Sequence, residues 1–283
     1  MKQWLKEWSI TLPSLLWLTL FFLIPTLIVA SFSIRVPEPN GGLGQGWSFG
    51  TLDIIFDPKI FQLFIRTLIL SLAATLGSVL IATPIAYTMA RSSKRMQHLL
   101  LVLVVVPFWS SFLVRIFAWK SLLHPDGVLK QTLVFLHIIP ETTQLLYNDL
   151  AVISVMVYTY LPFAILPLYA AFSKFDFQLF DAAYDLGANK TVTFFKVFLP
   201  NIKWALISAA SMVFIPCIGA YVIPDLVGGT AAEMIGNEIA QKIFYDRNIP
   251  EASVLSTALT LLILLPAFAW SYVKPLATSR GSQ

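Results

Sequence analysis

TLILSLAATLGSVLIATPIAYTMA occupies residues 67–90 and contains no charged side chain, although arginine stands on both sides of it, at Arg66 and Arg91. A helix needs about 20 mostly apolar residues to cross the hydrocarbon core of a bilayer. The run therefore predicts a membrane-spanning helix. The composition of the whole chain agrees, because only 12% of its residues are charged and its mean hydropathy is +0.77, whereas about a quarter of the residues of a soluble domain are charged.

Five further charge-poor runs are long enough to span a bilayer. They lie between Glu7 and Arg35, from Arg95 to about Trp119, between Asp149 and Lys174, between Lys203 and Asp225, and between Glu251 and Lys274. Together the six runs predict an all-α integral membrane protein with six transmembrane helices. The first run is longer than the apolar segment of a cleaved signal peptide, so we expect a retained helix.

The distribution of basic residues predicts the orientation, because Lys and Arg are enriched in cytoplasmic segments. With the N-terminus inside, eleven of the 19 Lys and Arg residues fall on the inner side, whereas most of the acidic residues fall outside. Both termini are then cytoplasmic. We expect one transmembrane domain, residues 1–283, with outer loops at 34–65 and 120–148 and a further outer segment at about 224–250. The outer stretch 37–50 is rich in Pro and Gly, which predicts irregular structure.

The sequence offers little for bond chemistry. Its three histidines are scattered without metal-ligand spacing, and its one cysteine, Cys217, cannot form an intramolecular disulfide. A phosphate-binding loop needs glycine directly before its lysine, but Asn189 precedes Lys190. We therefore expect no catalytic residue, metal site or cofactor in this chain. The modest net charge of +4 is distributed across the membrane and does not indicate nucleic acid as a partner.

The longest inner loop contains DAAYDLGANKTVTFFKVFLP, residues 181–200, which predicts a helical hairpin. Asp176 can cap a helix over 177–186, and Gly187 suits the left-handed position that ends it. A second short helix is expected over 191–199. Pro200 then fits the first turn of the fifth span, where no backbone N–H is needed.

The first helix of this hairpin is amphipathic and carries two acids on one face. Asp181 and Asp185 are four residues apart, a spacing at which like charges repel by a few tenths of a kcal/mol. A basic partner would remove that cost, and the small side chains of Ala182 and Ala183 permit its close approach. These features predict docking to a cytoplasmic partner. The alternative is a helix lying on the bilayer with its acids in water.

The hairpin resembles the signature of ATP-binding cassette (ABC) importer permeases, in which Glu-Ala-Ala is followed by Gly and then by Leu-Pro. The matching residues are Asp181, Ala182, Ala183, Gly187, Leu199 and Pro200. The one departure is Asp181, which is one methylene shorter than the usual Glu. The resemblance implies type I ABC importer permease architecture. It makes 176–199 the coupling hairpin, which fits a groove on a separate ATPase and transmits its closure to the spans.

Two further stretches, 104–123 (VVVPFWSSFLVRIFAWKSLL) and 224–244 (PDLVGGTAAEMIGNEIAQKIF), resemble the polyamine branch of these permeases. That resemblance implies a bacterial inner-membrane importer of spermidine or putrescine that works by alternating access. It also implies a second similar permease, two ATPase subunits that bind ATP and Mg, and a periplasmic polyamine-binding protein that meets the outer loops. Branches for ferric iron, thiamine or opines share the fold, so the cargo stays open among these.

A polyamine cation is attracted to aromatic faces and carboxylates, which points to candidate path residues. We hypothesise that Trp109, Tyr160, Tyr221 and Asp225 face the translocation path. Arg115 would repel such a cargo, so we expect it to point outward or to pair with an outer acid. A stand-alone secondary transporter or membrane enzyme is the rival from another class. Against it stand the coupling signature and the absence of charged relay residues at mid-span.

Overall fold

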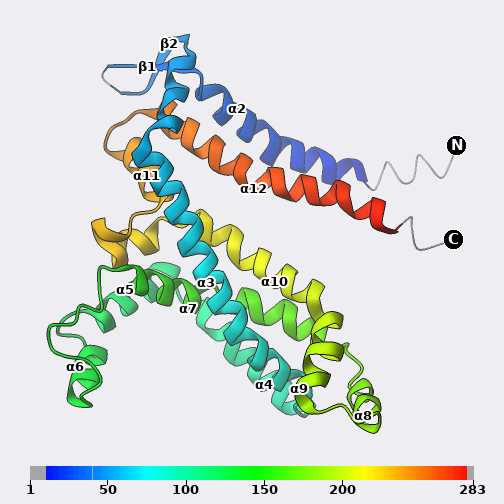
Figure 1. Ribbon diagram of the computed structural model, residues 1–283. Helices are drawn as coiled ribbons and strands as arrows, with labels where there is room; N and C mark the ends of the chain where they lie inside the picture. The colour runs from blue at the N-terminus through cyan, green and yellow to red at the C-terminus, as the bar shows by residue number, and fades with distance from the viewer. Residues whose placement is uncertain (1–10, 40, 279–283) are drawn as a thin grey trace, which may run out of the picture. The chain divides into compact units, whose positions relative to one another are not determined.

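The computed structural model describes residues 11–39 and 41–278, and most of them are helical (Figure 1). The main helices are α2 (Ile24–Phe32), α3 (Pro58–Arg91), α4 (Lys94–Val105), α5 (Phe112–Leu123), α6 (Val128–Phe135), α7 (Asp149–Phe172), α8 (Gln178–Asp185), α9 (Lys190–Thr193), α10 (Leu199–Ile218), α11 (Ile235–Phe244) and α12 (Ile249–Thr278). The helix that includes α2 begins at Thr11 and contains the π-helical turn η1 (Thr19–Leu23).

Five of the described helices are long and apolar enough to cross a membrane. They are Thr11–Phe32, Pro58–Arg91, Asp149–Phe172, Lys190–Ile218 and Ile249–Pro266. A bent pair, Lys94–Trp109 with Phe112–Phe135, also passes this test when its two halves are taken together, and it raises the number of spans among the described residues to six if the pair forms one crossing. The all-α membrane fold is thereby confirmed. The cytoplasmic placement of the termini stays a prediction, and Lys2, Lys6 and Arg280, on which it partly rests, lie outside the described residues.

The third predicted span is not one continuous helix, and here the expectation of an unbroken run to Trp119 is wrong. The two halves of the bent pair meet at an angle of 92°. Between them, the 3-10 turn η3 (Val106–Trp109) contains Pro107, which cannot donate a backbone hydrogen bond. Ser110 and Ser111 then adopt ψ values of 150° and 138°. Two consecutive non-helical residues after a proline allow the chain to turn sharply.

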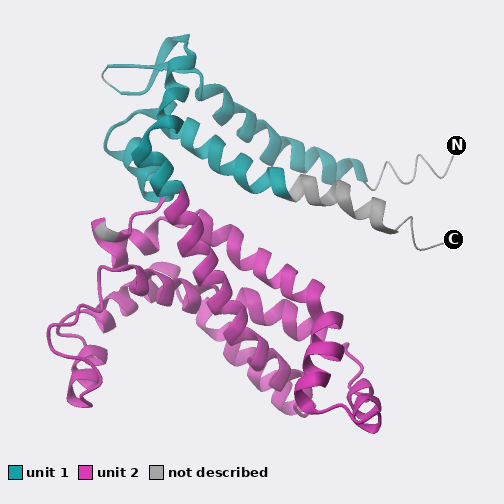
Figure 2. Cartoon of the chain, viewed as in Figure 1, with its two compact units in different colours: residues 1–64, 235–283 teal, residues 65–234 magenta. Residues whose placement is uncertain are grey.

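The chain forms two compact units, residues 1–64 with 235–283 and residues 65–234 (Figure 2). Helix α3 contributes its first residues to unit 1 and the rest to unit 2. Both units contain membrane-spanning segments. The expected single transmembrane domain and its outer loops stay predictions.

In unit 1, helices α2 and α12 lie side by side (Figure 1), and the hydroxyls of Ser33 and Thr257 are 3.1 Å apart. Ion pairs join the ends of its helices. Lys59 Nζ lies 3.1 Å from the buried carboxylate of Glu238, and Lys242 lies 2.9 Å from Glu251 and 3.3 Å from Asp246. Burial alone would lower the pKa of Lys242, but hydrogen bonds and attraction from both carboxylates outweigh it and raise that pKa.

The stretch 37–50 is more regular than its composition suggests. Strands β1 (Arg35–Pro37) and β2 (Leu43–Trp47) form an antiparallel hairpin, followed by the 3-10 helix η2 (Phe49–Phe56). The guanidinium of Arg35 lies 4.2 Å from the ring centroid of Trp47, its cross-strand partner. Gly41, Gly42 and Gly46 all have positive φ. Gly41 and Gly42 lie in the connection between the two strands and Gly46 lies within β2, so the glycines that argued for irregularity permit a hairpin.

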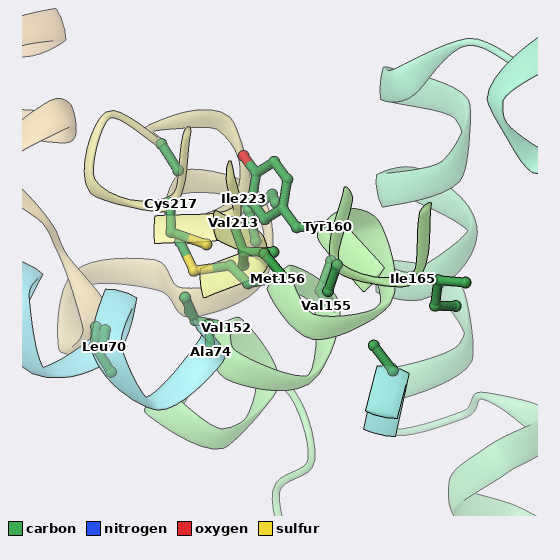
Figure 3. Close-up of a cluster of buried hydrophobic side chains, with 14 of the residues drawn as sticks. Leu70, Ala74, Val152, Val155, Met156, Tyr160, Ile165, Val213, Cys217 and Ile223 are labelled. Atoms are coloured by element: carbon green, nitrogen blue, oxygen red, sulfur yellow. The ribbon is translucent and has the colours of Figure 1, made fainter. Parts of the chain in front are cut away.

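The core of unit 2 lies around α7 (Figure 3). Fully buried residues follow α7 from Val152 to Leu168, and α10 packs against it with Val213 and Cys217. Helix α3 contributes a face of small residues, namely Ser71, Ala74, Ser78, Ala82 and Ala86, none of which is exposed. A Cβ atom on Gly77 would lie 3.0 Å from Val157 Cγ2, so α3 and α7 approach closely there. Small side chains permit such close contacts between membrane helices.

Candidate functional site

Helix α8 begins and ends where its sequence predicts, within one residue. The carboxylate of Asp176 accepts a hydrogen bond of 3.0 Å from the Gln178 backbone N–H, which helps start the helix. At its end Gly187 has φ +80° and donates to the Tyr184 carbonyl, while Ala188 donates to the Ala183 carbonyl. These two bonds form a Schellman motif, which needs a residue with positive φ. The predicted break at Gly187 is therefore present.

One face of α8 is exposed and carries both acids. Asp181, Ala182, Asp185 and Leu186 are all exposed, and Leu186 reaches 89%. Within the part of the chain that the structure describes, neither aspartate forms an ion pair. Four residues at i, i+1, i+4 and i+5 share one side of a helix. The result is an unpaired acidic face with an apolar side chain at its tip.

The opposite face of α8 is held by a cluster of aromatic rings. We define the aromatic cluster as Tyr87, Phe172, Phe175, Phe177, Phe180 and Phe198, which come from α3, α7, the loop before α8, α8 itself and the segment before α10. Phe198 is fully buried, and its centroid lies 5.5 Å from that of Tyr87 and 5.8 Å from that of Phe180. Edge-to-face rings at such distances interact favourably. The cluster thereby joins α8 to α3, to α7 and to the segment that leads into α10.

The second half of the hairpin differs from the expected separate short helix. The Asn189 side chain caps α9 by accepting from the Val192 N–H at 2.8 Å. The chain then passes through the π-helical segment η4 (Phe194–Phe198) straight into α10. Pro200 has no N–H for the Lys196 carbonyl and its ring crowds that group, so the helix widens and the Leu199 N–H donates to Phe194 instead. Leu199 is half-buried and Pro200 is exposed.

Two of the four candidate path residues, Tyr221 and Asp225, lie together just after the C-terminal end of α10. The Asp225 N–H donates to the Tyr221 carbonyl at 3.0 Å, which puts the two side chains one helical turn apart, and both are exposed. Asp225 opens the π-helical turn η5 (Pro224–Gly228) and has no ion-pair partner among the described residues. The pair offers an aromatic face beside a free carboxylate.

The other two candidates lie in different surroundings. Trp109 is 82% exposed at the break between α4 and α5. Tyr160 is only 8% exposed, belongs to the core around α7 (Figure 3), and its hydroxyl lies 3.5 Å from the Pro216 carbonyl. The structure therefore brings Tyr221 and Asp225 together and leaves Tyr160 inside the packed core of unit 2. A role of all four in the path stays a prediction.

One alternative for Arg115 was an ion pair with an outer acid. Among the described residues it forms no such pair. Its guanidinium lies 5.0 Å from the ring centroid of Phe108, and its Nε atom is buried without a hydrogen-bond partner. A planar guanidinium is weakly hydrated and stacks well on an aromatic face. The stacking keeps the cation on α5 beside the break in the third span.

The segment that carries Asp225 is fixed to the start of α7. The Tyr147 N–H donates to the Val227 carbonyl at 2.8 Å. Gly229 has φ +59° and ψ −163°, a conformation open only to glycine, and a Cβ there would lie 3.0 Å from the Tyr147 ring. A Cβ on Gly228 would lie 2.6 Å from Val152. Both glycines are thus required for this close approach.

We expect Gly229→Ala to destabilise the protein by about 1–3 kcal/mol, because alanine is strained at this φ and ψ and meets the Tyr147 ring. The measurement is the thermal midpoint of the purified protein in detergent. Gly219→Ala is the matched control, since Gly219 has φ −91° and open space around its Cβ position. Equal midpoints for the two variants would contradict the assignment.

Comparison with known proteins identifies the family. The model of the binding-protein-dependent transport system inner membrane component family matches residues 78–273, which include α8, the aromatic cluster and Asp225. The chain belongs to this family. It is 35% identical over 254 residues to the spermidine/putrescine transport system permease protein PotB of Haemophilus influenzae, covering 90% of this chain and 89% of that one. It is 31% identical to PotB of Escherichia coli K12, covering 87% of this chain and 90% of that protein.

A more distant relative and a solved structure agree with the family. The inner membrane ABC transporter permease protein YdcU of Escherichia coli K12 is 31% identical, covering 75% of this chain and 71% of that one. The crystal structure of a bacterial ABC transporter involved in alginate import matches with a TM-score of 0.66 at 17% identity, covering 100% of this chain and 97% of that chain. That likeness shows a shared fold. The protein is thus a multi-pass inner-membrane permease of the binding-protein-dependent transport family.

Two residues of this permease that matter to the candidate site were not singled out from the sequence. Leu186 projects from the tip of α8. The sequence contained a signal for it, because helical spacing places Leu186 outside the stripe that contains Phe180 and Tyr184. Tyr147 supports the Asp225 segment across a gap of some eighty positions in the chain. Its backbone has φ +63°, and a tyrosine in the sequence does not indicate this conformation.

Proposed function

We propose that this chain is the permease subunit of an ATP-driven importer of polyamines such as spermidine and putrescine. It carries no catalytic residue of its own and pairs with a second, similar permease. Two ATPase subunits bind ATP and Mg, one of them docks on α8 of this chain, and a periplasmic binding protein delivers the polyamine. The observation that carries the proposal is the unpaired acidic face of α8, held on the aromatic cluster at the family's signature position.

The geometry of α8 supports a coupling role for the hairpin 176–199. The exposed face offers Asp181 and Asp185 to cationic side chains of a partner, while Ala182 lets that partner approach closely. The buried face rests on Phe180 and Ala183. ATP-dependent closure of the ATPases would displace α8, and the aromatic cluster would pass that displacement to α3, α7 and α10. Packed rings are suited to this, because close-packed groups transmit displacement.

The polyamine assignment rests on the relatives and on the chemistry of the outer end of α10. Several proteins named as spermidine/putrescine permeases are 31–35% identical over most of the chain. A polyamine is an extended cation with several ammonium groups, and Tyr221 with Asp225 presents an aromatic face and a carboxylate. Both groups attract ammonium ions. Ferric iron, thiamine and opines are the rival cargoes.

The direct test is uptake by the assembled transporter. The full set of subunits is expressed in a bacterial strain that lacks its own polyamine importers, and uptake of labelled spermidine and putrescine is measured. ATP hydrolysis by the purified complex is then scanned over spermidine, putrescine, ferric iron, thiamine and an opine in the presence of the binding protein. Stimulation by a solute other than a polyamine would change the assigned cargo and leave the assignment as an importer permease intact. Transport by the chain alone, without an ATPase, would contradict the proposal of an ATP-driven importer.

We expect Asp225→Asn to lower polyamine uptake about tenfold or more at unchanged expression, because a charge-assisted contact with an ammonium group contributes about 1.5–3 kcal/mol. The control is Glu141→Gln, which removes the same charge from an exposed outer position without an ion pair among the described residues. Normal uptake by Asp225→Asn, or an equal loss in both variants, would remove Asp225 from the path.

A further inference from the structure

A groove runs between α3 and the coupling hairpin within unit 2, and the two cations at its rim, Arg91 and Lys190, have no role in the proposed transport cycle. Its volume is about 500 Å³. The lining residues are Thr83, Pro84, Tyr87, Thr88 and Arg91 of α3, Phe180 and Tyr184 of α8, Lys190 of α9, and Phe194 and Phe198 of η4. We call it the hairpin groove.

The hairpin groove changes from apolar to cationic along α3. Thr83 and Pro84 lie within the apolar run of that helix, whereas Arg91 ends it. Eight residues of helix correspond to about 12 Å along the axis. The apolar part therefore lies at the depth of acyl chains when Arg91 lies at the membrane–water boundary. Phe194 and Phe198 extend the apolar wall on the other side.

The two cations of the hairpin groove are not neutralised by the protein. Arg91 donates to the Tyr87 hydroxyl at 2.9 Å, and its guanidinium lies 5.5 Å from the ring centroid of Phe177. Neither Arg91 nor Lys190 forms an ion pair within the described residues, although Asp181 and Asp185 lie on the adjacent α8. The rings fix the guanidinium in place, and its remaining N–H groups are available to an anion.

We propose that the hairpin groove binds one anionic glycerophospholipid, with its phosphate on Arg91 and Lys190 and an acyl chain along Thr83, Pro84 and Thr88. An arginine guanidinium suits a phosphate because it can donate two parallel hydrogen bonds. A soluble phosphate would fill only the cationic end, whereas an amphiphile also covers the apolar walls. The bound lipid would touch α3, α8 and α9 together and brace the hairpin against the span.

The test uses the assembled transporter, reconstituted in nanodiscs of phosphatidylcholine that contain a minor fraction of phosphatidylglycerol with a photoactivatable acyl chain. Cross-linked peptides are mapped by mass spectrometry, and native mass spectrometry counts the phosphatidylglycerol that stays bound. The double variant R91Q/K190Q removes both cations. K94Q/K174Q is the matched control, because Lys94 and Lys174 are exposed, lie outside the groove lining and have no ion pair among the described residues. T88W fills the apolar part without changing charge.

We expect cross-links within 83–91 and 190–198 in the wild type. Retention of phosphatidylglycerol should fall roughly 30-fold in R91Q/K190Q, from the usual contribution of each cation near an anionic lipid surface, and by less than about twofold in the control. T88W should lose the cross-links at unchanged net charge. Equal loss in both double variants, unchanged cross-links in T88W, or competition by glycerol 3-phosphate at equal concentration would each overturn the proposal. So would wild-type cross-links that avoid the groove because another subunit fills it.

Discussion

Reversing both acids of the exposed α8 face, in D181K/D185K, should abolish assembly with the ATPase and reduce ATP-dependent uptake about a hundredfold or more. The two carboxylates are exposed and have no ion-pair partner among the described residues, so a cationic partner surface would meet two positive charges in place of two negative ones. Opposing like charges across an interface costs several kcal/mol. The measurements are co-purification of the ATPase with the tagged chain and uptake of labelled polyamine.

The fold of the double variant should be intact, which separates lost docking from misfolding. Like charges four residues apart on an exposed helix change stability by only a few tenths of a kcal/mol, so the thermal midpoint in detergent should stay unchanged. The single reversals then decide which aspartate makes the contact. If D185K alone disrupts co-purification, the shorter Asp181 does not replace the Glu of the family signature. Normal co-purification of the double variant would exclude α8 as the docking element.

Local chemistry in the sequence was sufficient for several elements. The charge-free runs predicted the spans, because hydrocarbon solvation allows few other structures. Gly187 predicted the end of α8, since only glycine takes a φ of +80° without strain. The departures arise where neighbouring residues act together. The 92° bend needs Pro107 followed by two extended serines, and the π-helical link into α10 needs Pro200 to displace the bond of Lys196.

The sequence could not show which side of each helix faces the candidate path. Helix α7 is apolar on nearly all sides, so its sequence has no periodicity that separates core from lining. Tyr160 was chosen for its ring and hydroxyl, yet it packs inside unit 2, while Tyr221 is exposed beside Asp225. The difference depends on which side of each helix meets α10 or solvent. Such information comes only from the tertiary packing.

Phe198→Ala should uncouple transport from ATP hydrolysis, with uptake falling more than about tenfold while the complex still hydrolyses ATP. Phe198 is fully buried, and its ring contacts Tyr87, Phe172, Phe175 and Phe180. Truncating a buried Phe to Ala costs about 3–5 kcal/mol, partly through the cavity left behind. The cavity would lie between α8 and two spans, so α8 could move without moving them.

The control for this prediction comes from the same π-helical segment. Phe195 is exposed, and among the described rings it contacts only that of Phe194, so Phe195→Ala removes an identical side chain from η4 without opening the cluster. Its uptake and ATPase activity should match the wild type. Phe198→Leu retains most of the volume and should recover part of the uptake, since packing rather than ring chemistry transmits the displacement. If Phe198→Ala lowers the thermal midpoint but leaves polyamine uptake per ATP unchanged, the aromatic cluster supports the fold without carrying the coupling, and the displacement of α8 must reach the spans through the continuous backbone of α9, η4 and α10.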